Sequence, residues 1–164
     1  YCFDARYFCY CEDTDLVLRA NLLGYEPVYV DNVLALHEGQ ASSGSGFNSF
    51  IAYHGLRNSI WMQMKLIPAP VLRRHGVWLL LAHLLSGMRY ALTGQLGLLT
   101  RIYRDAWSQR SAFLQERQHW IAASRLSAAQ LRRRMSPRFY RAGYWKAACV
   151  QLVAQLRRRP APRP

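Results

Sequence analysis

Residues 6–15 read RYFCYCEDTD, and this stretch decides the fold that the sequence predicts. Its first six residues are rich in aromatic side chains, which favour a short β-strand. The acidic residues that follow suit the first turn of a helix, because carboxylates there interact favourably with free backbone amides and the helix dipole. Leu16, Ala20 and Leu23 then share one helical face, and Gly24 is placed to end that helix in a left-handed conformation. We therefore expect a strand that leads directly into a helix.

The following residues continue this mixed pattern. Residues 27–30 and 33–36 predict two short strands around a turn. Three glycines and four serines indicate a mobile loop over residues 38–49. A helix over residues 48–67, ended by Pro68 and Pro70, is predicted from an apolar stripe formed by Tyr53, Leu56, Ile60, Met64 and Ile67.

Beyond residue 68 the pattern predicts only helices, over about 72–98, 100–134 and 138–158. The charge changes sign along the chain: residues 1–38 carry seven acidic and two basic side chains, near −5, and the other 126 carry two acidic and twenty basic ones, near +18. A basic surface attracts phosphate groups, either on nucleic acid or on anionic lipid. We do not expect nucleic acid as a partner, because the basic residues are spread over several helices without a known reader motif.

A membrane surface is the partner that we expect for the basic helices, and a merely solvated basic face stays open as the alternative. Residues 75–88 form a charge-free run of 14, whereas a helix needs roughly 20 apolar residues to span a bilayer. Extending the run to residue 100 places Arg89 near mid-membrane, at a cost of about 2.5–3.5 kcal/mol. These helices are therefore expected to pack on the preceding domain or to lie in the membrane interface. The expected location is cytoplasmic and peripheral, at the inner face of the cell membrane, with an anionic membrane surface as partner.

The residue pattern that carries chemistry is Glu12-Asp13-x-Asp15, followed by His37-x-Gly39. A helix start after a strand holds a carboxylate at the edge of a sheet, where ligands of α/β folds collect. Such a carboxylate can act as a general base or a metal ligand, and His37 can be a further ligand. Two simpler interpretations stay open: the acidic turn only stabilises a helix start, and the histidine only makes a structural hydrogen bond.

Residues 3–44, FDARYFCYCEDTDLVLRANLLGYEPVYVDNVLALHEGQASSG, resemble the second half of the catalytic domain of family 2 glycosyltransferases. This is the inverting family with the GT-A fold, and rhamnosyltransferase-like members are the most similar. The stretch YHGLRNSIW at 53–61 resembles the family's Y-x-x-x-R-N-x-x-W pattern. The resemblance implies an α/β, Rossmann-like fold for residues 1–46, completed by a helix over 47–67. A basic, mainly α-helical extension over 68–164 would then associate with a membrane.

The resemblance also implies a function. A sugar would pass, with inversion, from a nucleotide-sugar donor to a glycan or lipid-linked acceptor. Asp13 would be the general base that takes the proton of the acceptor hydroxyl, with Glu12 beside it. His37 would approach a divalent cation, Mg²⁺ or Mn²⁺, on the donor diphosphate.

Three further residues would bind substrate according to the resemblance, namely Asp15, Arg57 and Trp61. Arg57 has an alternative role as a surface or salt-bridging residue. Trp61 lies four positions further along the same helix, where it can simply stack on Arg57.

The resemblance covers only the second half of the family's catalytic domain. The chain begins at Tyr1 rather than at a methionine, and we expect the nucleotide-binding half, with its metal-binding D-x-D, to be missing. Asp13-Thr14-Asp15 also spells D-x-D, but it opens a helix after Glu12, whereas the metal-binding version ends a long apolar strand. We therefore expect the chain to be inactive alone.

Two other functions compete with this interpretation. The first is a non-catalytic basic helical module that binds anionic membrane or nucleic acid. The second is a small zinc protein with the ligands Cys2, Cys9, Cys11 and His37, although their spacing lacks the paired cysteines of known zinc sites.

Overall fold

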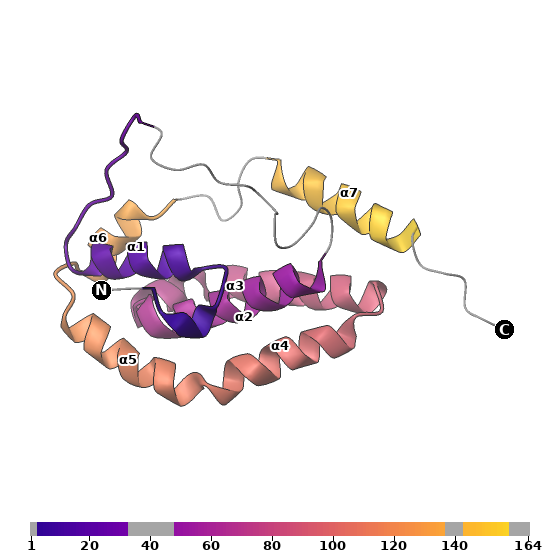
Figure 1. The fold of residues 1–164 in the computed structure, drawn as a ribbon, viewed down its shortest axis with the longest axis horizontal. Coiled ribbons are helices and arrows are strands. Elements are labelled where there is room, and N and C mark those ends of the chain that lie inside the picture. The colour runs from indigo at the N-terminus through magenta and orange to yellow at the C-terminus, as the bar shows by residue number, and fades with distance from the viewer. Residues whose placement is uncertain (1–2, 33–47, 137–142, 158–164) are drawn as a thin grey trace.

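The structure is a computed structural model that describes residues 3–32, 48–136 and 143–157. Within these ranges every regular element is a helix (Figure 1). One short 3₁₀ helix, η1, precedes the α-helices. The elements are η1 (Ala5–Tyr7), α1 (Glu12–Leu22), α2 (Ser49–Leu66), α3 (Ala69–Leu92), α4 (Leu96–Ser108), α5 (Arg110–Ala122), α6 (Ala128–Arg134) and α7 (Tyr144–Arg157).

The α/β prediction is therefore wrong for the described part of the chain, which contains no strand. Residues 6–11 do not pair with another segment. They form the end of η1 and a tight turn in which Phe8, Tyr10 and Cys11 have φ angles of 64°, 65° and 67°. A β-strand requires negative φ throughout, so this backbone cannot form a ladder.

The second predicted strand is absent as well. Residues 27–30 have no regular structure, and the side chains of Val28 and Tyr29 are 81% and 86% exposed. The described residues contain no strand with which this segment could pair, and β propensity alone does not form a sheet. The third predicted strand, 33–36, lies outside the described residues, as do residues 38–47 of the glycine- and serine-rich loop.

The helix predictions agree better with the structure. Helix α1 ends in a Schellman motif: Gly24 has a φ of 90°, and the backbone N–H of Tyr25 donates to the carbonyl of Ala20 over 3.0 Å. Helix α2 occupies the predicted range and is capped by Asn48, whose side chain accepts from the N–H of Phe50.

Helix α3 ends before the predicted helix over 72–98 does, and the helix predicted over 138–158 lies partly outside the described residues, which contain α7. Gly94, with a φ of 70°, ends α3 in a second Schellman motif. The helix predicted over 100–134 is divided into α4, α5 and α6. Between α5 and α6 the N–H of Arg125 donates to the carbonyl of Leu22 at the end of α1, over 2.7 Å. Ser127 then starts α6 with a capping box completed by Gln130.

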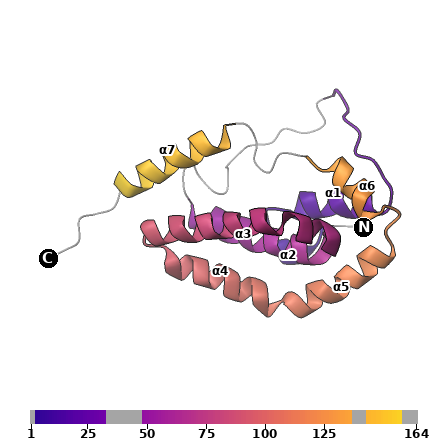
Figure 2. The ribbon, with the colours of Figure 1, turned by 180° about the vertical axis from the view of Figure 1, so that it is seen from behind.

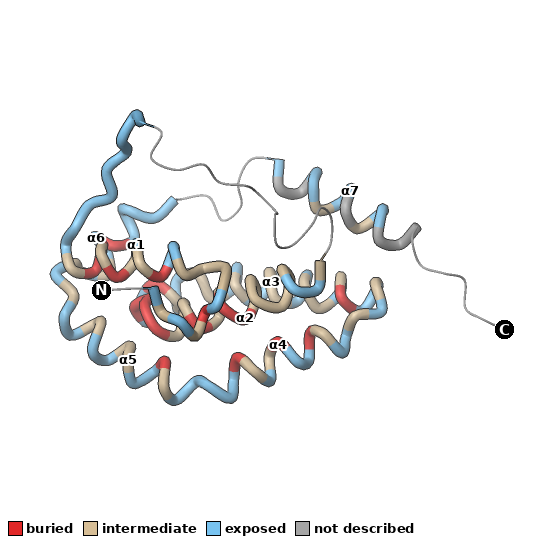
Figure 3. The backbone as a smooth tube through the Cα atoms, viewed as in Figure 1, coloured by how far each residue is buried: buried red, intermediate tan, exposed pale blue. Residues whose placement is uncertain are grey.

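Helix α2 is central to the packing. It contacts α1, α4 and α5, while α3 contacts α4 and α6 (Figures 1 and 2). The buried residues gather along the sides of the helices that face α2 (Figure 3). They form three clusters: Tyr7, Trp61, Ala106 and Phe113; Leu22, Leu66 and Leu131; and Tyr90, Leu99 and Ile102. Helices after residue 68 thus share their core with the earlier residues. Among the described helices, none has both the length and the apolar character needed to cross a bilayer.

Candidate active site

The start of α1 presents one accessible carboxylate. Asp13 is exposed, and its Oδ1 accepts hydrogen bonds from the backbone N–H of Thr14 over 2.6 Å and from the Thr14 hydroxyl over 3.2 Å. Its Oδ2 accepts no hydrogen bond from any residue in the described ranges. Asp13 lines a groove of about 660 Å³ that lies between α1 and the end of α6 and also includes Thr14, Val17, Glu26, Arg134 and Ser136.

Glu12 differs from its neighbour. Its Oε2 is buried, and no described residue gives it a hydrogen bond.

The two cysteines before α1 have raised pKa values. Burial raises the pKa of the Cys11 thiol to about 11, and the carboxylates of Asp13 and Glu12 add to this effect. Burial, followed by the charge of Glu12, also raises the pKa of Cys9. Both thiols are therefore protonated at neutral pH and are poor nucleophiles.

Asp15 is fully buried. Its Oδ1 accepts from the Tyr7 hydroxyl over 3.1 Å and lies 2.9 Å from Nζ of Lys65, and its Oδ2 accepts from Nε of Arg19 over 2.7 Å. Both oxygens thus have cationic partners inside the protein. In this structure Asp15 fixes α1 to η1 and α2, and the predicted contact with substrate remains a prediction.

Lys65 is the centre of a wider network of charges. Besides Asp15, its Nζ lies 2.8 Å from the Asp4 carboxylate and 3.6 Å from that of Glu116. The Arg6 guanidinium forms ion pairs with both of these carboxylates. Burial alone would raise the pKa of Asp4, but the hydrogen bonds from Arg6 and Lys65 outweigh it and hold this pKa well below its usual range. The network ties the N-terminal residues to α2 and α5.

Asn58 clamps the turn that precedes α1. It is completely buried, and its Nδ2 lies 2.8 Å from each of the carbonyl oxygens of Tyr7, Cys9 and Tyr10. Two amide hydrogens are therefore shared among three acceptors. Non-glycine residues with positive φ cost about 1–3 kcal/mol each and persist only where their surroundings enforce them, and this amide supplies such enforcement. The turn that delivers Asp13 is held by a residue more than forty positions away.

Arg57 and Trp61 support this clamp. Nε and Nη2 of Arg57 donate to Oδ1 of Asn58 over 3.0 and 2.9 Å, which orients the amide. The guanidinium lies 4.2 Å from the centre of the Trp61 ring, so the predicted stacking between them is confirmed. Trp61 stacks on Phe113 with ring centres 4.9 Å apart and donates from Nε1 to the carbonyl of Ala106. Both predicted substrate-binding residues are buried, and their contact with substrate is not tested.

Sequence analysis gave no role to Asn58 or Lys65. A usable signal was present, because Asn58, Trp61 and Lys65 follow the i, i+3, i+7 spacing of one helix face. The predicted apolar stripe of α2 is instead mostly half-buried, with only Ile67 fully buried. The most buried face of α2 therefore mixes polar and charged residues with Trp61.

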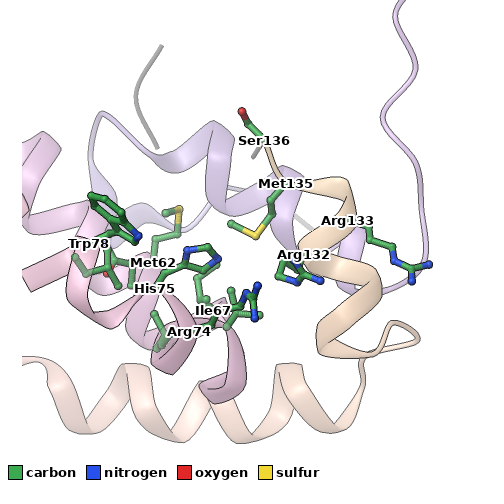
Figure 4. Close-up of a pocket in the computed structure, with 13 residues that line it drawn as sticks. Met62, Ile67, Arg74, His75, Trp78, Arg132, Arg133, Met135 and Ser136 are labelled. Carbon is green, nitrogen blue, oxygen red and sulfur yellow. The ribbon is translucent and has the colours of Figure 1, made fainter. Parts of the chain in front are cut away.

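A second groove adjoins the first. It has a volume of about 870 Å³, lies among α2, α3 and α6, and shares Met135 and Ser136 with the groove of Asp13 (Figure 4). Apolar side chains and arginines line it together. Sequence analysis predicted neither groove.

The structure describes only part of the expected metal site. His37 and Cys2 lie outside the described residues. Within the described residues there is no group of three or more histidine, cysteine or acidic side chains arranged to hold a metal ion. Glu12 and Asp13 alone do not complete a site for Mg²⁺, which takes octahedral oxygen coordination.

Comparisons with known proteins add no assignment. No family model matches the chain, and no significant match exists among curated proteins or solved structures.

Proposed function

We propose that this chain forms the acceptor side of an inverting glycosyltransferase, with Asp13 as the general base. One observation carries the proposal: Asp13 is exposed at a groove, its Oδ2 accepts from no described residue, and the turn before it is held by buried residues in a strained conformation. Strained, over-determined backbone is typical of functional sites. The motif resemblance supports the same residue.

The proposed reaction needs one proton acceptor on this chain. The acceptor hydroxyl gives its proton to the Asp13 carboxylate while its oxygen forms a bond to the anomeric carbon of the donor sugar. The bond from that carbon to the nucleotide diphosphate breaks, and the diphosphate leaves with the electron pair on the opposite face, which inverts the centre. Glu12 precedes this base in the first turn of α1.

Donor binding is proposed to require the family's nucleotide-binding half. The residues that resemble the family are those of its second half, and a divalent cation would be held in the nucleotide-binding half, with the donor diphosphate and His37. The cation would supply charge stabilisation on the leaving group. The described residues of this chain do not complete a site for the cation by themselves.

The test is Asp13→Asn in the enzyme that combines this chain with the nucleotide-binding half. Release of nucleoside diphosphate from a panel of nucleotide sugars, in the presence of a lipid extract, should fall at least about 100-fold, because general-base catalysis contributes about 10²–10⁴. The control is Asp31→Asn, at an exposed carboxylate outside both grooves. Near-normal turnover in Asp13→Asn would overturn the proposal.

A second function, membrane binding without catalysis, is favoured by the outer face of α3. This face exposes a series of large apolar side chains, and arginines lie at its start, at Arg73 and Arg74. The series comprises Val77, Trp78, Leu80, Leu81, Leu84, Leu85, Met88 and Leu92. A helix of this kind suits the interface of an anionic membrane. Within the main proposal, the same face keeps the enzyme peripheral at the inner face of the cell membrane.

A further inference from the structure

The groove among α2, α3 and α6 combines two kinds of lining. Its floor is apolar and includes Ile67, Val71 and Leu79, with Trp78 at one end. Its edge carries the basic side chains of Arg74, Arg132 and Arg133, together with His75. Figure 4 shows Arg132 on the same side as His75 and Ile67, whereas Arg133 points away toward the edge of the view. A ligand that fits this lining has an anionic group and a hydrocarbon part.

The basic side chains at this groove have no carboxylate partner among the described residues. Arg74, Arg132 and Arg133 are exposed, and no described carboxylate pairs with any of them. The next residue behaves differently: Arg134 lies 2.6 Å from the Glu26 carboxylate and also donates to the carbonyl of Tyr25. The end of α6 thus satisfies one arginine internally and leaves two for an external anion. Guanidinium groups bind phosphate oxygens strongly, often through two parallel hydrogen bonds.

The apolar part of the groove continues onto an exposed surface. Trp78 lines the groove and also belongs to the outer face of α3, where Leu81, Leu85 and Met88 are exposed. Residues 75–88 contain no charged side chain apart from two histidines. Hydrocarbon entering at Trp78 therefore meets continuous apolar surface for several helical turns.

The groove also adjoins the proposed catalytic carboxylate. Met135 and Ser136 line both it and the groove of Asp13. An anionic group held by Arg74 and Arg132 would therefore lie next to the groove in which an acceptor hydroxyl meets Asp13.

We propose that this groove binds the phosphate group of an acceptor that is carried on a hydrocarbon chain. Arg74 and Arg132 bind the phosphate, the chain lies over Trp78 and the outer face of α3, and the hydroxyl end extends toward Asp13. This inference rests on the proposed function and narrows its acceptor to a lipid phosphate or diphosphate.

The test is direct calorimetric binding to the full chain without donor. Dodecyl phosphate below its micellar concentration is compared with inorganic phosphate and with the neutral dodecyl maltoside. Dodecyl phosphate should bind at least about tenfold more tightly than either, because only it supplies both the charge and the chain. Inorganic phosphate binding as tightly would show that the chain is not recognised and would overturn the proposal.

Two matched double variants locate the site. Arg74→Gln with Arg132→Gln should weaken the binding of dodecyl phosphate at least about tenfold, since both charge-assisted hydrogen-bonding groups for the phosphate are removed. Arg110→Gln with Arg125→Gln removes the same charge from exposed positions outside the groove and should change affinity less than about twofold. Equal weakening in both would overturn the site. The proposal would also be overturned by a DNA duplex that binds more tightly than dodecyl phosphate and loses this binding in the Arg74→Gln, Arg132→Gln variant.

The outcomes separate this inference from the proposed function. Binding is measured without catalysis, and Asp13→Asn should bind dodecyl phosphate normally. If dodecyl phosphate binding requires Arg74 and Arg132 but sugar transfer does not require Asp13, only the proposed function is overturned. If sugar transfer requires Asp13 but dodecyl phosphate binding does not require Arg74 and Arg132, only the proposed binding groove is overturned.

Discussion

The turn before α1 and the outer face of α3 use their side chains in opposite ways. Around the turn, Asp15, Asn58 and Lys65 are at most 2% exposed, and each has partners inside the protein. Along α3, Trp78 and Leu84 are both 59% exposed, without cover from any described residue. The buried polar residues around the turn thus stabilise the fold by joining α1, η1 and α2. The apolar residues of α3, which would suit a hydrophobic core, instead lie at the surface, where we propose that a ligand or a membrane covers them.

The largest expected effect comes from breaking the buried charges. Lys65→Met leaves the carboxylates of Asp4 and Asp15 inside the protein without their shared cation. Removing one partner of a buried ion pair costs about 3–5 kcal/mol. Urea unfolding should show a loss of this size, whereas Lys146→Met, at an exposed position of α7, should leave the midpoint unchanged. An unchanged midpoint in Lys65→Met would show that the network contributes nothing to stability.

A somewhat smaller effect is expected from removing the clamp. Asn58→Leu keeps the side-chain volume but removes the amide donor from three carbonyls. The carbonyl of Tyr7 still accepts from the N–H of Cys9, whereas those of Cys9 and Tyr10 lose the donor that the described residues give them. Unsatisfied buried acceptors cost about 1–3 kcal/mol each, so the loss of two should lower the free energy of unfolding by about 3 kcal/mol.

Amide hydrogen exchange gives the matching structural measurement for this variant. Exchange should accelerate in residues 7–15 and change little in α4. The control is Asn32→Leu, where the side chain is exposed. Uniform acceleration across all helices would contradict a local clamp and indicate global destabilisation only.

The smallest effect on stability belongs to α3. Leu84→Gln should change the free energy of unfolding by less than about 0.5 kcal/mol, because the side chain is already exposed. Binding to vesicles of phosphatidylcholine and phosphatidylglycerol should nevertheless weaken about fivefold, since about 1 kcal/mol of apolar burial is lost. Leu114→Gln on α5, 44% exposed, is the matched control and should bind as the unchanged protein does. Equal weakening in both variants would remove the special role of α3.

Part of the candidate site was predictable from the sequence. The acidic stretch at 12–15 predicted a helix start with accessible charge, and Asp13 is exposed there. The stacking of Arg57 on Trp61 followed from their spacing and is confirmed. The two grooves were not predictable, because α6 packs against α3 only through tertiary contacts.

The sequence by itself determined features that depend on near neighbours. The start of α1, the glycine that ends it and the range of α2 follow from caps, periodicity and breakers within a few residues. Tertiary structure alone decided that residues 6–11 form a turn rather than a strand. Their carbonyls are taken by Asn58, and a strand needs a partner that propensity cannot supply. Tertiary structure also decided which charges are buried, since burying Asp15 is favourable only where Lys65 and Arg19 meet it.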